Sequence, residues 1–296
     1  RANPDIEVFV HERGARHLID PSKLVASATR LYGEDMDRLW GAVLPVPAAR
    51  VRTLSGNERL SAGGRELEVA DTPGHASHHV SYFDSSSGIA FVGDTAGIRR
   101  GAGAYIMPPT PPPDIDLEAW RISADRILSW DPDTLFLTHF GPFRGARPHF
   151  QELFERLDTW SAIVRRLLAD STIDDRERER RFVEEGHQDI RKTVGEAEAE
   201  QYGRAGRLDY SWQGLARYWR RLVSWLTVIF VLLNILKALE LEGVQVSGVT
   251  GRPWPIVLGL GLLILVRFPR LARLLTRLIL GPPQAPATLP TLFRGP

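Results

Sequence analysis

The sequence contains no cysteine in its 296 residues, which excludes disulfide bonds and thiolate metal ligands. Its formal net charge is only +1, so the overall charge gives no argument for a nucleic-acid partner. It also lacks a Gly-x-Ser-x-Gly segment, the signature of a serine nucleophile on a sharp strand-to-helix turn. Any metal site must therefore use histidine and carboxylate ligands, which suit zinc, iron or manganese.

Three residues with ligand chemistry each follow an apolar, strand-like run. His75 ends the segment Asp-Thr-Pro-Gly-His, Asp94 lies in Phe-Val-Gly-Asp-Thr, and His139 lies in Leu-Phe-Leu-Thr-His-Phe-Gly-Pro. A fold brings metal ligands to one rim in this way, from the ends of several strands. Each pair taken singly is an ordinary turn, so the alternative is three unrelated turn residues.

The neighbours of these residues also favour a site. Gly74 and Gly93 allow the backbone to turn sharply beside a ligand. Thr95 and Thr138 are candidates for hydrogen bonds that orient the ligands. The alternative for both threonines is an ordinary turn hydroxyl.

The order and spacing of these motifs resemble the later metal-binding motifs of the metallo-β-lactamase superfamily of hydrolases. The resemblance covers roughly residues 1–170 and is strongest over 66–143. It implies that His75 binds a first metal ion, that His139 binds a second, and that Asp94 bridges the two. Two zinc ions per site are expected, with iron or manganese as alternatives.

The first motif of that family, of the form HxHxDH, does not occur in this sequence. In the resembled family this motif lies shortly before a strand and a Gly-Ala-x-His segment like Val8–His17. We therefore expect the chain to be truncated at its N-terminus, with the missing motif just upstream of Arg1. Such a fragment should bind the first metal poorly and show little activity.

The pattern of apolar residues predicts an α/β protein that is rich in strands first and then alternates strands with helices. The resemblance implies a four-layer αβ/βα sandwich, incomplete at the N-terminus, with a helical C-terminal extension. The predicted strands are 6–10, 51–54, 65–70, 79–84, 88–92 and 134–138, and the predicted helices are 21–32, 117–130, 150–168 and 184–221. The predicted parts of the chain are a partial metallo-β-lactamase-like domain (1–170), a polar helical extension (171–221), a hydrophobic region (222–280) and a disordered tail (281–296).

Two apolar runs, Leu222–Leu236 and Trp254–Val266, distinguish the C-terminal region. Arginines precede the first run and follow the second, while acidic residues lie between them. Under the positive-inside rule this predicts a helical hairpin with both ends in the cytoplasm, followed by a basic amphipathic helix over Phe268–Leu280. We therefore expect a cytoplasmic protein attached to the inner face of the membrane. The alternatives are a soluble tail packed on the core or on a partner, and an artefactual tail.

Several other residues are candidates of lower rank. His17 and Arg144 are candidates for contact with a substrate, and Arg144 is expected on the same rim as His139. His78 is expected to pack beside the site, with metal binding as the alternative, and His79 is expected to be structural. The Pro-rich loop that contains Tyr105 either shapes access to the site or is a passive wrap.

These features together predict a hydrolase that directs a metal-bound hydroxide at an ester, thioester or lactone carbonyl of a small-molecule substrate. The resemblance favours the hydroxyacylglutathione hydrolase and lactonase branch, on the Thr-Pro-Gly-His-x-x-x-His form and the Gly-Asp-Thr motif. In that family a helical extension often covers the active site or makes a homodimer contact. The alternatives are a non-catalytic, membrane-tethered binding module of the same fold and an enzyme like the mononuclear iron persulfide dioxygenases.

Overall fold

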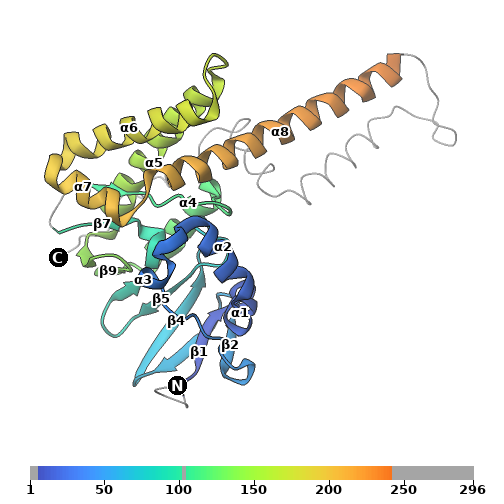
Figure 1. Ribbon diagram of the computed structural model, residues 1–296. Coiled ribbons are helices and arrows are strands. Elements are labelled where there is room, and N and C mark those ends of the chain that lie inside the picture. The colour runs from blue at the N-terminus through green and yellow to red at the C-terminus, as the bar shows by residue number, and fades with distance from the viewer. Residues whose placement is uncertain (1–5, 102–104, 242–296) are drawn as a thin grey trace, which may run out of the picture. The chain divides into compact units, whose positions relative to one another are not determined.

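The computed structural model describes residues 6–101 and 105–241 (Figure 1). The chain divides into two compact units, Arg1–Trp219 and Arg220–Pro296. All the described strands and helices α1–α7 belong to the first unit. The described part of the second unit is the C-terminal portion of helix α8, which ends at Leu241.

A six-stranded sheet lies at the centre of the first unit, with the strand order β10-β9-β6-β5-β4-β3. Neighbouring strands are antiparallel, except that β6 and β9 are parallel. The strands are β3 (Arg59–Ala62), β4 (Arg65–Asp71), β5 (Val80–Asp84), β6 (Ile89–Phe91), β9 (Thr134–Leu137) and β10 (Gly141–Arg144). The predicted hairpin of 79–84 and 88–92 is confirmed as β5 and β6.

Two smaller strand pairs flank this sheet. One is the parallel pair of β1 (Val8–His11) and β2 (Val51–Leu54), and the other is the antiparallel pair of β7 (Ile98–Arg99) and β8 (Ile106–Met107). The chain between β1 and β2 forms short helical elements: α1 (Glu12–Ile19), α2 (Ser22–Tyr32), η1 (Gly33–Asp35), α3 (Met36–Leu39) and η2 (Ala48–Arg50). A single 3-10 turn, η3 (Gly93–Ala96), follows β6.

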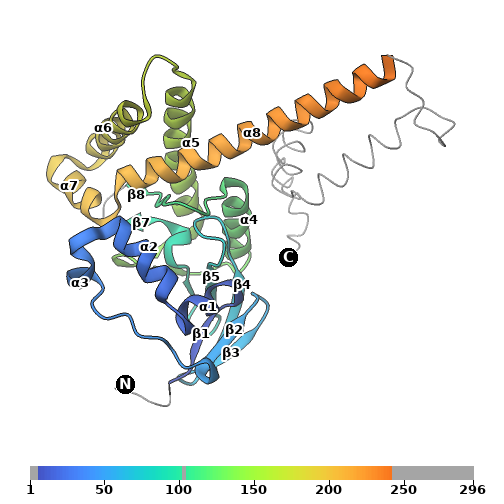
Figure 2. The same ribbon diagram turned by 45° about the vertical axis from the view of Figure 1, so that its right-hand side comes forward.

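The remaining helices are α4 (Leu117–Leu128), α5 (Ala146–Ala169), α6 (Asp175–Val194), α7 (Glu196–Ala205) and α8 (Leu208–Leu241). Asp116 and Asp174 start α4 and α6, because each side chain accepts a hydrogen bond from the backbone of the first helical turn. Figure 2 shows α6 and α7 on the side of the unit away from β1 and β2. The predicted α/β class with a helical C-terminal extension is confirmed.

One apolar core joins the sheet to these helices. Trp120 of α4 and Trp160 of α5 are fully buried in it, together with Phe182 of α6 and Tyr202 of α7. Side chains of β6 and β9 complete the same cluster. The polar extension therefore packs on the core through its apolar face, while its charged side chains lie on the surface.

Several elements were not predicted from the sequence, among them helix α1 and strands β3, β7, β8 and β10. Helix α1 is short and charged, and its buried residues are only Gly14 and Ala15. Strand β3 has no fully buried residue; the Gly63-Gly64 turn sets it against β4, because both glycines have the positive φ angles that a tight hairpin turn requires.

The described part of the chain contains no helix long and apolar enough to cross a membrane. The second predicted apolar run, the predicted amphipathic helix and the predicted tail all fall within 242–296, outside the described residues.

Candidate metal centre

His75, Asp94 and His139 lie at the same edge of the central sheet. His75 follows β4, Asp94 lies in η3 directly after β6, and His139 lies in the turn between β9 and β10. Strands β4 and β6 are both antiparallel to β5, and β6 is parallel to β9, so all three strands run in one direction. Their C-terminal ends consequently meet at one edge, which explains why residues far apart in sequence converge.

The carboxylate of Asp94 lies between the two imidazoles. Its Oδ2 atom is 3.5 Å from Nε2 of His75, and its Oδ1 atom is 3.4 Å from Nε2 of His139. Each carboxylate oxygen therefore faces a different imidazole nitrogen. The structure thus places the three predicted residues together, with Asp94 in the middle.

The hydrogen bonds around these residues fit a bound cation. Nδ1 of His75 lies 2.8 Å from the carbonyl oxygen of Pro109; because a carbonyl oxygen only accepts, Nδ1 carries a proton, and Nε2, which faces Asp94, is the nitrogen left to bind a metal ion. Oδ1 of Asp94 is buried and has no hydrogen-bond partner among the described residues. A nitrogen lone pair and an unpaired carboxylate oxygen are the donor set that zinc, iron or manganese takes.

The site consists of two residue pairs, His75 with Asp94 and His139 with Asp94. Among the described residues, no group of three or more His, Asp or Glu side chains is placed to hold a metal ion. Each of the two imidazole Nε2 atoms nevertheless lies within 3.5 Å of a carboxylate oxygen of Asp94. Together with the unpaired Oδ1 atom of Asp94, these distances make the site a candidate metal centre.

His79 supports the site without facing Asp94. Its Nδ1 atom lies 2.9 Å from Oγ1 of Thr72 and 3.0 Å from Oγ1 of Thr95. Burial lowers the pKa of His79 to about 3, and the neighbouring His75 adds to this effect, so the ring is neutral near pH 7. Thr95 therefore bonds this supporting histidine and the carbonyl oxygen of Thr72.

Gly93 provides the space that His79 occupies. Its φ angle is +51°, and a Cβ atom added there would overlap Nε2 of His79 and lie 2.9 Å from Cε1. The glycine beside Asp94 thus serves both the turn and the packing of the imidazole behind it.

Trp120 of α4 is a supporting residue that the sequence analysis missed. Its ring makes an edge contact with His75, with 5.9 Å between the ring centroids, and its Nε1 atom donates a hydrogen bond of 2.6 Å to the carbonyl of Thr95. The backbone of Gly74 lies against Trp120 so closely that any Cβ atom would overlap it. The Thr-Pro-Gly-His segment predicted a sharp turn at the glycine, but nothing in it indicated a contact with Trp120.

The other candidates lie in different places. His78 is exposed and interacts electrostatically with Asp114, His17 and His75, whereas His17 lies partly buried on α1. Asp114 also accepts a hydrogen bond of 2.6 Å from Oγ of Ser77. These side chains therefore surround the segment that carries His75, on the side of α1.

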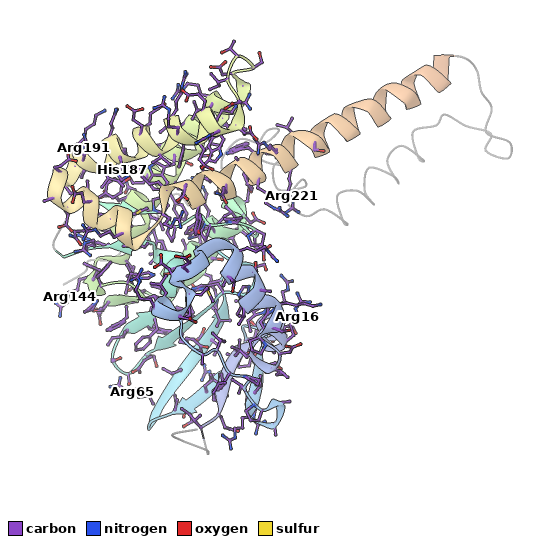
Figure 3. The ribbon with its side chains drawn as sticks, viewed as in Figure 1. Arg16, Arg65, Arg144, His187, Arg191 and Arg221 are labelled. Carbon is purple, nitrogen blue, oxygen red and sulfur yellow. The ribbon has the colours of Figure 1, made fainter. Side chains whose placement is uncertain are left out.

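The prediction that Arg144 shares a rim with His139 is wrong. In the β9–β10 hairpin Arg144 pairs with Thr134 at the start of β9, whereas His139 follows the end of β9. The two residues therefore lie at opposite ends of the hairpin, since each residue of a strand advances about 3.3 Å. Figure 3 shows Arg144 at the outer side of the molecule.

In comparisons with known proteins, residues 3–139 match the family model described as "Metallo-beta-lactamase superfamily". A metallo-beta-lactamase fold-containing protein of Sulfurisphaera tokodaii is 30% identical over 119 residues, which are 40% of this chain and 44% of that protein. The chain thus spans less than half the length of this curated relative. His75, Asp94 and His139 all lie within the matched family region.

Two solved structures are also similar. One is an archaeal metallo-beta-lactamase superfamily protein from Sulfolobus tokodaii, with 27% identity and a TM-score of 0.44, covering 51% of this chain and 58% of that one. The other is a metallo-beta-lactamase family protein from Thermus thermophilus, with 20% identity and a TM-score of 0.49, covering 73% of this chain and 66% of that one.

Proposed function

We propose that the protein is a metal-dependent hydrolase of an ester, thioester or lactone, on the premise that residues 3–139, which match the metallo-beta-lactamase superfamily model, belong to that superfamily. The observation that carries the proposal is the carboxylate of Asp94, which presents one oxygen to His75 and the other to His139. Those three residues are the proposed metal ligands. The hydroxyacylglutathione hydrolase and lactonase branch is the proposed relative, supported by the Thr-Pro-Gly-His-x-x-x-His form.

His75, Asp94 and His139 would hold a divalent metal, which would supply an acidified water molecule and polarise the carbonyl of the substrate. The protein's own part is to prepare the ligands. The hydrogen bond from His75 to the carbonyl of Pro109 keeps the lone pair of that imidazole on Nε2. Asp94 contributes the negative charge that offsets the charge of the cation.

Two residues behind the ligands help to fix the orientation of His75 and Asp94. The ring of Trp120 lies against His75, and the neutral ring of His79 fills the space next to Gly93. Because Trp120 is buried and His79 packs directly behind Gly93, the geometry of His75 and Asp94 is set before substrate binds.

Asp94→Ala tests the proposal. We expect its metal content, measured by elemental analysis, to fall, and hydrolysis of a model thioester or lactone to fall by at least about 100-fold, because the shared ligand is lost. Asp125→Asn, an exposed change on α4, is the matched control and should match wild type in both. Normal metal content and rate in Asp94→Ala would refute the assignment. The elemental analysis also shows whether the bound metal is zinc, iron or manganese.

A further inference from the structure

Helix α8 makes a close backbone contact with the Pro-rich loop, which runs from Tyr105 to Pro113. Gly214 of α8 lies against Thr110 and Pro111: an added Cβ atom would overlap the carbonyl oxygen of Thr110 and lie 2.9 Å from the carbonyl carbon of Pro111. Oγ1 of Thr110 lies 3.5 Å from the carbonyl oxygen of Ser211, one turn earlier in the helix. Thr110, Ser211 and Gly214 are all buried, so the helix and the loop pack directly against each other, with no water between them.

The same loop makes the hydrogen bond that fixes His75. Pro109 directly precedes Thr110, and its carbonyl oxygen accepts from Nδ1 of His75 at 2.8 Å. The loop is rich in proline, whose ring fixes φ, so it has few ways to absorb a local displacement. A shift imposed on Thr110 by the helix is therefore transmitted to the carbonyl of Pro109.

The far end of the loop is also tied to the helical extension. Tyr105 donates a hydrogen bond of 2.7 Å to Asp189 of α6, and Tyr202 of α7 donates one of 2.7 Å to the carbonyl of Tyr105. The loop is thus attached to the extension at Tyr105 and at Thr110, and Pro109, between these two points, bonds His75 of the candidate metal centre.

We propose that Gly214 is a positioning residue for His75. By having no side chain, it allows α8 to hold the backbone at 109–111 where the carbonyl of Pro109 fixes the tautomer of His75, with the proton on Nδ1 and the lone pair on Nε2. The helical extension thereby sets the state of a metal ligand that it does not touch. Its importance for metal binding rests on the proposed function, but its effect on the tautomer does not.

Gly214→Ala tests this inference in the metal-free protein. Long-range proton–nitrogen NMR spectra of ¹⁵N-histidine-labelled protein report the tautomer of His75 directly. We expect wild type to show the Nδ1-protonated form, and Gly214→Ala to lose it in part or in full while keeping the circular dichroism of a folded chain. The affinity for added zinc should fall by about 10-fold, the range seen when a partner of a ligand is removed.

Gly206→Ala is the matched control, since it adds the same atom in the extension but meets only flexible side-chain ends, with Cε of Met107 at 2.8 Å. It should leave the His75 tautomer unchanged. Should Gly214→Ala not fold, Thr110→Val takes its place, because it removes the hydroxyl contact with Ser211 at equal volume. An unchanged His75 signal in the folded Gly214→Ala variant, or failing that in Thr110→Val, overturns the proposal. Because the tautomer is read without metal, this outcome is distinct from a failure of the proposed hydrolase function.

Discussion

His79 shows how a single residue beside the candidate centre couples stability to pH. Burial lowers its pKa to about 3, whereas the unfolded chain has a histidine pKa of about 6.5. Below pH 6.5 the unfolded state therefore binds a proton that the folded state does not. The contribution of His79 is complete above pH 6.5 and is lost as the pH falls towards 3, by up to about 1.4 kcal/mol per pH unit.

We predict that His79→Gln reduces this dependence. Wild type should lose about 1–2 kcal/mol of unfolding free energy from this group between pH 7 and pH 5, as measured by urea denaturation, and the variant should lose correspondingly less. His187→Gln on α6, labelled in Figure 3, serves as the control and should keep the wild-type slope. Equal slopes for His79→Gln and wild type would mean that the imidazole is not held neutral.

The sequence predicted the three candidate ligands because each lies at a turn directly after an apolar strand, a local pattern. It did not predict Pro109, since a backbone carbonyl carries no side-chain signal. It misplaced Arg144 because distance along the chain does not report which end of a hairpin a residue occupies. A local sequence pattern therefore does not predict contacts that depend on strand register or on backbone atoms.

Among the elements, the loop between β4 and β5 depends on its contact with α4. Gly74 has a φ angle of +144° and lies against the backbone of Trp120, and its carbonyl accepts from the backbone of Asp116 at 2.9 Å. Gly74→Ala should destabilise the protein by about 3 kcal/mol or more, since it adds both backbone strain and overlap. Gly63→Ala, at φ +59° with open space around it, should cost only about 1 kcal/mol. If urea denaturation gave the two variants equal losses of unfolding free energy, α4 would have to shift and make room for the new methyl group.

Elements with a strong apolar period, such as α5 and β4, could be predicted to within a few residues. Helix α1 and strand β3 could not be predicted, because each buries so few apolar side chains that its sequence shows no periodic pattern of apolar residues. Their positions are set by backbone geometry: His11 accepts a hydrogen bond that starts α1, and the Gly63-Gly64 turn returns the chain from β3 to β4. Tertiary context thus decides the weakly patterned elements.

At the scale of the whole first unit, the sheet and the helical extension share one core. Phe182 of α6 lies between Trp160 of α5 and Trp212 of α8, with ring centroids 5.8 and 5.9 Å away, and all three rings are buried in the cluster that includes β6 and β9. Phe182→Ala should therefore cost about 3–5 kcal/mol. The loss should appear in the sheet as well as in the helices, because the two cannot unfold separately without exposing this cluster.

Native-state hydrogen exchange distinguishes one cooperative unit from two. In Phe182→Ala we expect the slowest-exchanging amides of β5 and β9 to lose as much protection as those of α6. Ile122→Ala, at an exposed position of α4, is the control and should change protection by no more than about 0.5 kcal/mol. Loss confined to α6, α7 and α8 would mean that the extension folds on an independent sheet domain, as the predicted boundary near residue 170 implies. Parallel loss would mean that the candidate metal centre and the helices that position its loop form and unfold together.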